Sequence, residues 1–248
     1  MSSPRTFRLN KAHPQARSLQ GWWPYGDADY VTGLPVLWQT AAPALRSSPR
    51  QMMGSVPLFN GSKYGSCQST ARFLKSATRF TLMAWWYQVS TTSGAIFGTD
   101  NGFPDRIELI YNGSQVNAIA AGAAAGGAAS PVGWNHAALT LNGSSLLTYY
   151  NGKQVASSSS ATTTASTIGN LLIGRVDGGA QYAQDGGCEY RLYDRPLAAA
   201  EILDCYLNPL ALRKSLPSSS FVPASLSGAV RSVLRSGLLT SSMIGGQA

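Results

Sequence analysis

Five Asn-Gly pairs divide the middle of the sequence, and they constrain the fold more than any other feature. The pairs are Asn60-Gly61, Asn101-Gly102, Asn112-Gly113, Asn142-Gly143 and Asn151-Gly152. Asn-Gly readily adopts the positive φ angles of a two-residue type I′ turn, so each pair favours a hairpin between two antiparallel strands. The pattern therefore predicts an all-β domain.

Runs of β-branched and aromatic residues between the turns are the expected strands. They cover residues 80–89, 95–98, 106–111, 135–141, 145–150, 170–174 and 189–193. Antiparallel strands of this length predict a two-sheet sandwich.

Three further segments have a pattern of their own. Residues 118–130 are rich in Ala and Gly, which suits tight strand packing or a surface loop. Residues 196–207 predict a short helix, because proline is tolerated in a first turn and apolar side chains recur at helical spacing. Residues 225–239 have a similar apolar spacing, and a helix this short needs a surface on which to dock.

The net charge of +8 comes from the two ends of the chain. The basic residues of the ends are Arg5, Arg8, Lys11, Arg17, Arg213, Lys214, Arg231 and Arg235, and neither end contains an acid. The sequence thus predicts a neutral domain at residues 18–208 between basic arms at 1–17 and 209–248. A nucleic-acid-binding domain would concentrate charge on its folded face, so we expect no nucleic-acid partner. We expect the arm residues to attach the protein to a partner.

Cysteine and histidine usage argues against a metal or nucleophilic site. Cys67, Cys188 and Cys205 lie far from any CxxC spacing, which is typical of free thiols in a reducing compartment. With only His13 and His136 and no G-x-S-x-G motif, we expect no catalytic residue and no cofactor. The absence of a secretory signal and of a long apolar run predicts synthesis in the cytoplasm and no membrane contact.

Two adjacent tryptophan pairs, Trp22-Trp23 and Trp85-Trp86, lie in expected strands. Because side chains alternate across a strand, one ring of each pair points into the core and the other points outward. The outward rings form a possible aromatic surface. Such rings either stack on sugars or pack under a partner or the arms, and we favour packing.

Six segments in order resemble the laminin-G-like, or concanavalin A-like, jelly-roll domain in the form found in bacteriophage proteins. They are SLQGWWPY (18–25), VPLFNGSKYG (56–65), FTLMAWWYQ (80–88), GWNHAALTLNGSSLLTYYNGKQVAS (133–157), LLIGR (171–175) and GGCEYRLYDRPLAAAEI (186–202). The resemblance implies an antiparallel jelly-roll sandwich over residues 18–208, to which the basic arms and the short C-terminal helix are added.

Two departures from the family pattern concern chemistry. Asn60 stands where the family often has Asp, and Cys188-Glu189 stands where it often has an acidic pair. Calcium needs such carboxylate ligands, so we expect no metal site. A glycosidase on this fold needs two facing carboxylates, commonly in a Glu-x-Asp-x-x-Glu strand, whereas Glu108 is isolated in its strand. We therefore expect that the protein is not an enzyme.

The leading functional hypothesis is a bacteriophage virion protein, a capsid decoration or cement protein held by its arms. Its partners would be capsid or other virion proteins, and copies of itself in an oligomer, with a trimer favoured. The alternative is a carbohydrate- or receptor-binding module, for example on a tail fibre, which binds a surface glycan through outward Trp and Tyr residues.

Overall fold

The computed structural model describes residues 7–39, 44–47, 55–67, 70–89, 93–99, 101, 105–112, 115–129, 131–176, 181–183 and 186–215. The chain divides into two compact units, Met1–Lys214 and Ser215–Ala248, and the fold below is that of the first. The helix predicted at residues 225–239 lies outside the described residues, as do Arg5, Arg231 and Arg235.

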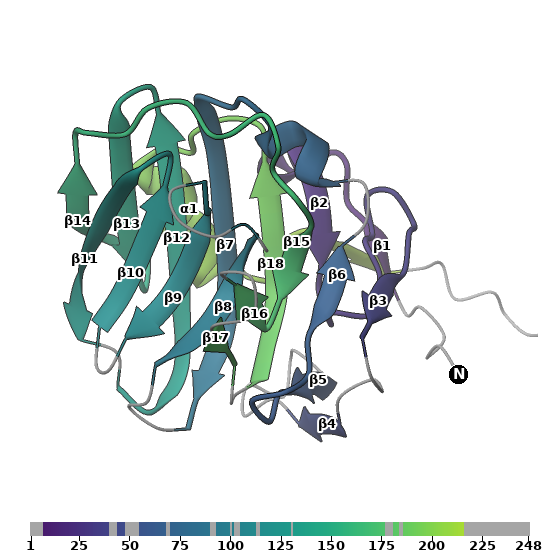
Figure 1. Ribbon diagram of the computed structural model, residues 1–248. Coiled ribbons are helices and arrows are strands. Elements are labelled where there is room, and N and C mark those ends of the chain that lie inside the picture. Colours follow the sequence, from purple (N-terminus) through teal and green to yellow (C-terminus); the bar gives the residue numbers. More distant parts are fainter. Residues whose placement is uncertain are drawn as a thin grey trace, which may run out of the picture. The chain divides into compact units, whose positions relative to one another are not determined.

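One layer of the fold is a seven-stranded antiparallel sheet, at the front of Figure 1. Its order is β11 (Ala123–Ala129), β10 (Gln115–Ala120), β9 (Glu108–Asn112), β8 (Gly94–Thr99), β15 (Leu171–Ile173), β6 (Gly65–Cys67) and β3 (Val36–Trp38). The Ala-rich segment forms β11 and the end of β10, because small side chains let these strands pack closely on the core.

The second layer is an eight-stranded sheet behind the first. Its order is β14 (Lys153–Ser158), β13 (Ser145–Tyr150), β12 (Gly133–Asn142), β7 (Arg79–Gln88), β18 (Gly186–Tyr193), β5 (Ser55–Leu58) and β4 (Ala44–Ser47), and β2 (Leu19–Trp23) also pairs with β18. The seven predicted strands all occur, with ends shifted by a few residues. The predicted all-β jelly-roll sandwich is confirmed.

The hairpin turns follow the prediction from Asn-Gly. Asn151 and Gly152 have φ angles of 46° and 79°, as the type I′ turn between β13 and β14 requires. Between β12 and β13 the pair is displaced by one residue, since Asn142 ends the strand and Gly143 enters the turn with a φ of 61°. Any other residue at either position would have to adopt the same positive φ, at a steric cost that glycine avoids.

The main core lies between the two sheets. Inward side chains of both layers, among them Leu82, Phe97 and Leu139, are fully buried there. The longest strands, β7 and β12, pair along their whole length from Arg79 to Gln88 and form the centre of the back sheet. Burial of this apolar surface is the main stabilising term of such a sandwich.

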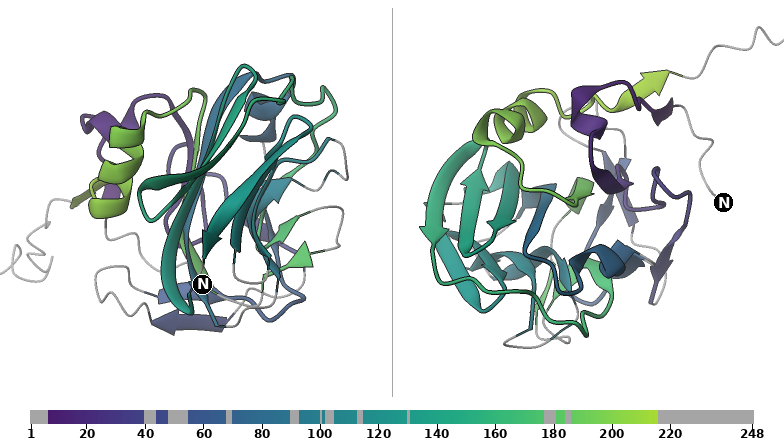
Figure 2. Two further views of the ribbon diagram at one scale, coloured as in Figure 1. Left: turned by 90° about the vertical axis from the view of Figure 1, so that its left-hand side faces the viewer. Right: turned by 90° about the horizontal axis from the view of Figure 1, so that it is seen from above.

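One α-helix is described, α1 (Ala199–Leu207), and it covers the outer face of the eight-stranded sheet (Figure 2). It starts three residues later than predicted, because residues 196–198 are extended. Short elements complete the unit: β1 (Phe7–Leu9), η1 (Pro14–Ala16), η2 (Thr70–Leu74), β16 (Arg175–Val176), β17 (Gln181–Tyr182) and β19 (Arg213–Ser215). No helix in the described part of the chain is long and apolar enough to cross a membrane.

Candidate functional site

The terminal segments pack on the outer face of the back sheet. β1 pairs with β19, and the Phe7 ring is buried against Trp22 and Tyr30, with ring centres 5.7 and 5.0 Å apart. Beside them η1 lies next to α1 (Figure 2), and the amide of Gln15 donates to the Asp204 carboxylate at 2.8 Å. Residues 7–17 and 209–214 therefore belong to the folded body.

A buried ionic network, formed by Glu189, Arg191 and Arg213, fastens these segments. Glu189 is fully buried and accepts from Arg191 at 3.0 Å and from Arg213 at 2.5 Å. The pKa of Arg191 is raised, because the neighbouring acidic groups outweigh the desolvation of its guanidinium. A bulge in β18 places Glu189 at a φ of 53°, which directs its side chain toward both arginines.

All four tryptophans of the expected aromatic surface are buried, so that expectation is wrong. Trp23 and Trp86 point into the main core, and Trp22 and Trp85 point outward, as alternation predicts. The outward rings are covered: Trp22 lies under Phe7, and Trp85 stacks on Tyr206 of α1 at 5.3 Å. Packing under an arm, part of the favoured interpretation, describes Trp22, whereas Trp85 is covered by α1, which lies within the predicted domain.

The basic residues of the arms divide into two groups. Arg8, Lys11, Arg17 and Lys214 are exposed. Arg213 is different, because its guanidinium is bonded to Glu189 and to the hydroxyl of Tyr25 at 2.7 Å. The expectation that Arg213 attaches a partner is corrected, since this charge is already paired inside the body.

His136 is a core imidazole, 1% exposed. It lies between Trp85 and Tyr206, with ring centres 5.3 and 6.0 Å away. Burial lowers its pKa to about 3, and the positive charge of Arg191 adds to the effect. The ring is thus neutral at physiological pH and contributes packing.

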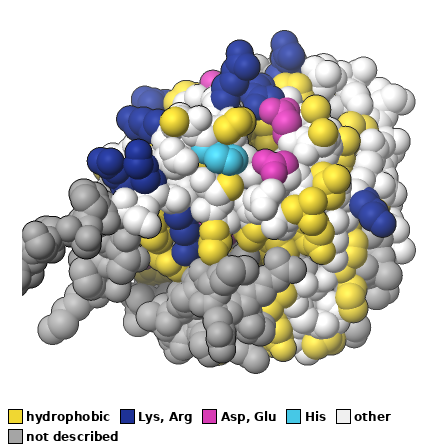
Figure 3. All heavy atoms as spheres, turned by 180° about the vertical axis from the view of Figure 1, so that it is seen from behind, with side chains coloured by type: hydrophobic (Ala, Val, Ile, Leu, Met, Phe, Trp, Pro, Cys, Tyr) yellow, Lys and Arg dark blue, Asp and Glu magenta, His cyan; other side chains and the backbone are white. Residues whose placement is uncertain are grey.

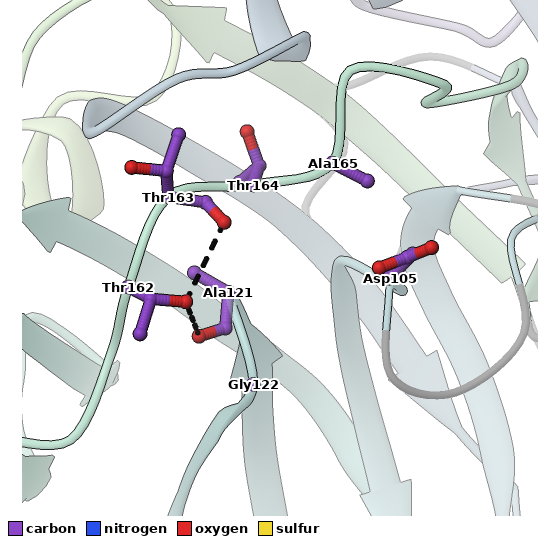
Figure 4. Close-up of a pocket in the computed structure, with 7 residues that line it drawn as sticks. All are labelled: Asp105, Ala121, Gly122, Thr162, Thr163, Thr164 and Ala165. Atoms are coloured by element: carbon purple, nitrogen blue, oxygen red, sulfur yellow. Dashed lines mark hydrogen bonds between the residues drawn. The ribbon is translucent and has the colours of Figure 1, made fainter.

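The pockets of the described part of the molecule include two small ones with carboxylates in their lining. The first, of about 130 Å³, is enclosed by the β10–β11 turn and residues 162–165 (Figure 4). The hydroxyl of Thr162 donates to the carbonyl of Ala121 at 3.0 Å, and Asp105 is the single carboxylate of the lining. The pocket therefore lacks the carboxylate pair that glycoside hydrolysis needs.

The second pocket, of about 190 Å³, lies between η1 and α1 and contains two carboxylates, Glu201 and Asp204. A hydrogen bond from Arg195 lowers the pKa of Glu201, and one from Gln15 lowers the pKa of Asp204. Hydrolytic proton donors need the opposite shift. Among the described residues, no three His, Cys, Asp or Glu side chains gather as metal ligands would.

An apolar patch lies on the outer face of the back sheet, on the side of the molecule that Figure 3 shows. The half-buried rings of Tyr87 and Trp134 meet edge to face at 5.6 Å, and Val89 and Val132 beside them are exposed. The indole nitrogen of Trp134 is buried, so the accessible part of this indole is carbon surface.

A second aromatic group, the tyrosine–arginine cluster, is formed by Tyr64, Arg175 and Tyr182. All three side chains are half-buried. The guanidinium carbon of Arg175 lies 4.4 Å from the centre of the Tyr64 ring and 5.3 Å from that of Tyr182. The two ring centres are 6.1 Å apart, and the ring planes meet at 62°. Cation–π attraction thus holds the charge between two partly exposed rings.

The cluster is built on the outer side of the front sheet, where the short β16–β17 hairpin lies beside β8 (Figure 1). Val176 packs on Ala95 and Ile110, and a Cβ at Gly98 would lie 2.7 Å from Val176. Glycine at position 98 therefore allows the close approach. The hairpin is joined to the loop of Tyr64 by a hydrogen bond from the Gly61 amide to the Ala183 carbonyl at 2.8 Å.

No sequence motif pointed to this cluster. Tyr64 and Arg175 end two segments that carry the family resemblance, whereas Tyr182 has no distinctive neighbours. The three residues meet only because β6 pairs with β15 and the chain then turns back through β16 and β17. The one available signal was the solvent-facing position of an arginine directly after the apolar LLIG strand.

Comparisons with known proteins agree on the fold. A family model described as the concanavalin A-like lectin/glucanases superfamily matches residues 60–203. No curated protein sequence matches the chain.

Among solved structures, domain 4 of AbnA, an extracellular GH43 arabinanase from Geobacillus stearothermophilus determined with arabinotriose, aligns with a TM-score of 0.60 at 16% identity. The alignment covers 75% of this chain and 97% of that domain. Trypanosoma rangeli sialidase aligns with a TM-score of 0.56 at 19% identity, over 78% of this chain and 33% of the sialidase. The binding domain of botulinum neurotoxin DC, determined with SialylT, gives 0.55 at 9% identity, over 78% of this chain and 52% of that one.

Proposed function

Because the chain belongs to the concanavalin A-like lectin/glucanase superfamily, we propose that it is a non-catalytic carbohydrate-binding protein whose saccharide site is the tyrosine–arginine cluster. The observation that carries the proposal is the placement of two half-exposed tyrosine rings around a guanidinium on the outer side of the front sheet. Sugars combine apolar C–H faces with hydroxyl groups, so their sites combine aromatic surface with a few fixed donors.

The other aromatic surfaces fit this role less well. The tryptophans of the expected surface are 0–2% exposed, because two lie in the core between the sheets and the other two lie under Phe7 and Tyr206. The Tyr87–Trp134 patch is accessible, but the indole nitrogen of Trp134 is buried. In the tyrosine–arginine cluster, the guanidinium of Arg175 offers donors between two rings, and no described carboxylate pairs with it.

The non-catalytic part of the proposal is supported by the state of the carboxylates. Glu189 is buried between two arginines, and the lowered pKa values of Glu201 and Asp204 suit neither as a proton donor at neutral pH. The relatives determined with saccharides, the arabinanase domain and the toxin binding domain, support saccharide binding as the role of this fold here.

A glycan array followed by titration calorimetry on the best saccharide tests the proposal. Tyr182→Ala should weaken binding about tenfold or more, because stacking on one aromatic ring contributes on the order of 1–3 kcal/mol. The matched control is Tyr87→Ala, which removes a half-buried tyrosine from the other sheet and should leave the affinity unchanged. Loss of binding in the control but not in Tyr182→Ala would place the site elsewhere, and an array without any binder would reject the function.

Attachment to a phage capsid, with localisation in the virion and a trimeric assembly, is a second proposal. Its support is the sequence resemblance and the exposed charges of Arg8, Lys11, Arg17 and Lys214. Co-sedimentation of the full chain with purified shells, compared with a chain that ends at Ser215, tests the contribution of the basic C-terminal region. Equal sedimentation of the two forms would remove that region from the proposal.

A further inference from the structure

Two arginines of this molecule have the same aromatic setting. The guanidinium carbon of Arg213 lies 4.6 Å from the Phe7 ring centre and 4.8 Å from that of Tyr25. That of Arg175 lies 4.4 and 5.3 Å from its two tyrosine rings. In the first case a carboxylate, Glu189, completes the arrangement by accepting a charge-assisted hydrogen bond. In this molecule, an arginine between two rings thus binds a carboxylate.

The second arginine has no such acceptor among the described residues. No carboxylate or carbonyl there accepts a hydrogen bond from Arg175. A guanidinium is always charged and presents five donors in one plane, so it is matched by a planar acid group rather than by a neutral hydroxyl.

The surroundings of the cluster are basic in the part that the structure describes. The segments 55–67, 171–176 and 181–183 contain no acidic residue, and Asp177 and Asp185, which follow two of them in the sequence, lie outside the described residues. Lys63 stands next to Tyr64 in the same loop. A positive group held in partly desolvated surroundings attracts an anion more strongly than one in bulk water.

We infer that the tyrosine–arginine cluster selects acidic saccharides, with Arg175 binding the carboxylate or sulfate group of the sugar and Tyr64 and Tyr182 flanking the ring. This inference rests on the proposed function, and it adds the class of ligand. The site requires no metal ion, because the cation that meets the acid group is a side chain.

Matched pairs of saccharides test the inference by calorimetry on the full chain. The pairs are oligogalacturonate with its carboxyl-reduced form, sialyllactose with lactose, and sulfated with unsulfated lactose. In at least one pair the acidic member should bind about tenfold more tightly than the neutral member, as expected for a charge-assisted hydrogen bond. The pair that shows the preference distinguishes a carboxylate from a sulfate ligand.

Variants then assign the preference to Arg175. Arg175→Ala should abolish the preference, so that the acidic and the neutral member of the pair bind with equal and weaker affinity. The control is Arg72→Ala, which removes an exposed arginine that lies 4.7 Å from one ring only, that of Phe73, and the preference should persist. A preference that survives Arg175→Ala would overturn the inference.

The outcomes separate the two levels of proposal. Equal affinity for both members of every pair, with binding lost in Tyr182→Ala, would overturn selection of acidic sugars and leave carbohydrate binding in place. Absence of binding to all members would overturn both.

Discussion

Arg213 and Arg175 lie in two regions of the molecule that both combine an arginine with two aromatic rings. Each guanidinium lies between two aromatic rings and both side chains are half-buried, yet Arg213 is paired with the buried Glu189, whereas Arg175 lies on a surface hairpin. The difference lies in what the chain supplies as the anion. In the first region a carboxylate of the chain is present and the group stabilises the fold; in the second no described residue supplies a carboxylate, and the proposed ligand would do so.

The comparison also explains why the two regions should respond differently to mutation. The buried ionic network contains charges that water cannot reach, so removing one partner leaves the others uncompensated. The tyrosine–arginine cluster keeps contact with solvent, which can replace a lost interaction. Mutations should therefore affect stability in the first region and binding in the second.

The largest effect is expected from Glu189→Gln. The variant keeps the shape of the side chain but leaves Arg191 and Arg213 without their carboxylate, and the free energy of unfolding should fall by about 3–5 kcal/mol. Urea denaturation measures the loss. Glu201→Gln, which breaks the partly exposed pair with Arg195, is the control and should cost about 1 kcal/mol. Equal losses would mean that the buried network contributes no more to stability than a partly exposed ion pair.

Phe7→Ala should have the next largest effect. The ring is buried against Trp22, Tyr30 and Arg213, and its removal should cost about 3 kcal/mol. The adjacent, exposed Arg8 provides the control, since Arg8→Ala should change stability by less than about 0.5 kcal/mol. If both variants were equally mild, residues 7–17 would be an arm after all.

His136 makes the closed region sensitive to pH. Its pKa is about 3 in the folded protein and 6.5 in an unperturbed state, so below pH 6.5 the unfolded chain takes up a proton that the folded one does not. Stability should therefore fall as pH decreases, by about 2 kcal/mol between pH 7 and pH 5.

Comparison with His136→Gln isolates this contribution. The variant is expected to be less stable at pH 7, but its free energy of unfolding should change by much less between pH 7 and pH 5. Protonation of Glu201 and Asp204 should also lower the free energy of unfolding. Because their pKa values are lowered in the folded protein, this loss occurs only at a pH below their pKa values in the unfolded chain. Parallel pH profiles for the two proteins would show that the imidazole titrates normally.

The sequence predicted the sandwich well because its signals are local. Asn-Gly turns and alternating strands depend on neighbours in the chain, and the strand ends are correct to within a few residues. The orientation of the tryptophan pairs followed from the same alternation. Their exposure did not follow, because it depends on Phe7 and Tyr206, which reach Trp22 and Trp85 from distant parts of the chain.

The candidate site could not be predicted for the same reason. The charge count separated two basic ends from a neutral middle, but it could not show that Arg213 meets Glu189 while Arg175 meets no described carboxylate. Both facts depend on strand pairing between residues that are far apart in the sequence. Composition thus assigned the functional charges to the ends, whereas the fold points to an arginine of the middle segment.

The smallest effect on stability is expected at the cluster itself. Arg175→Ala removes a half-exposed cation–π contact that contributes on the order of 0.5–1 kcal/mol, so the free energy of unfolding should fall by no more than about 1 kcal/mol. Arg213→Ala removes a similar contact together with the ion pair to a fully buried carboxylate, and should cost at least about 3 kcal/mol. Urea denaturation of both variants, measured side by side, compares their two losses in the free energy of unfolding. A large loss in Arg175→Ala would show that this arginine also serves the fold, and the absence of a carboxylate beside it would then no longer indicate a place for a ligand.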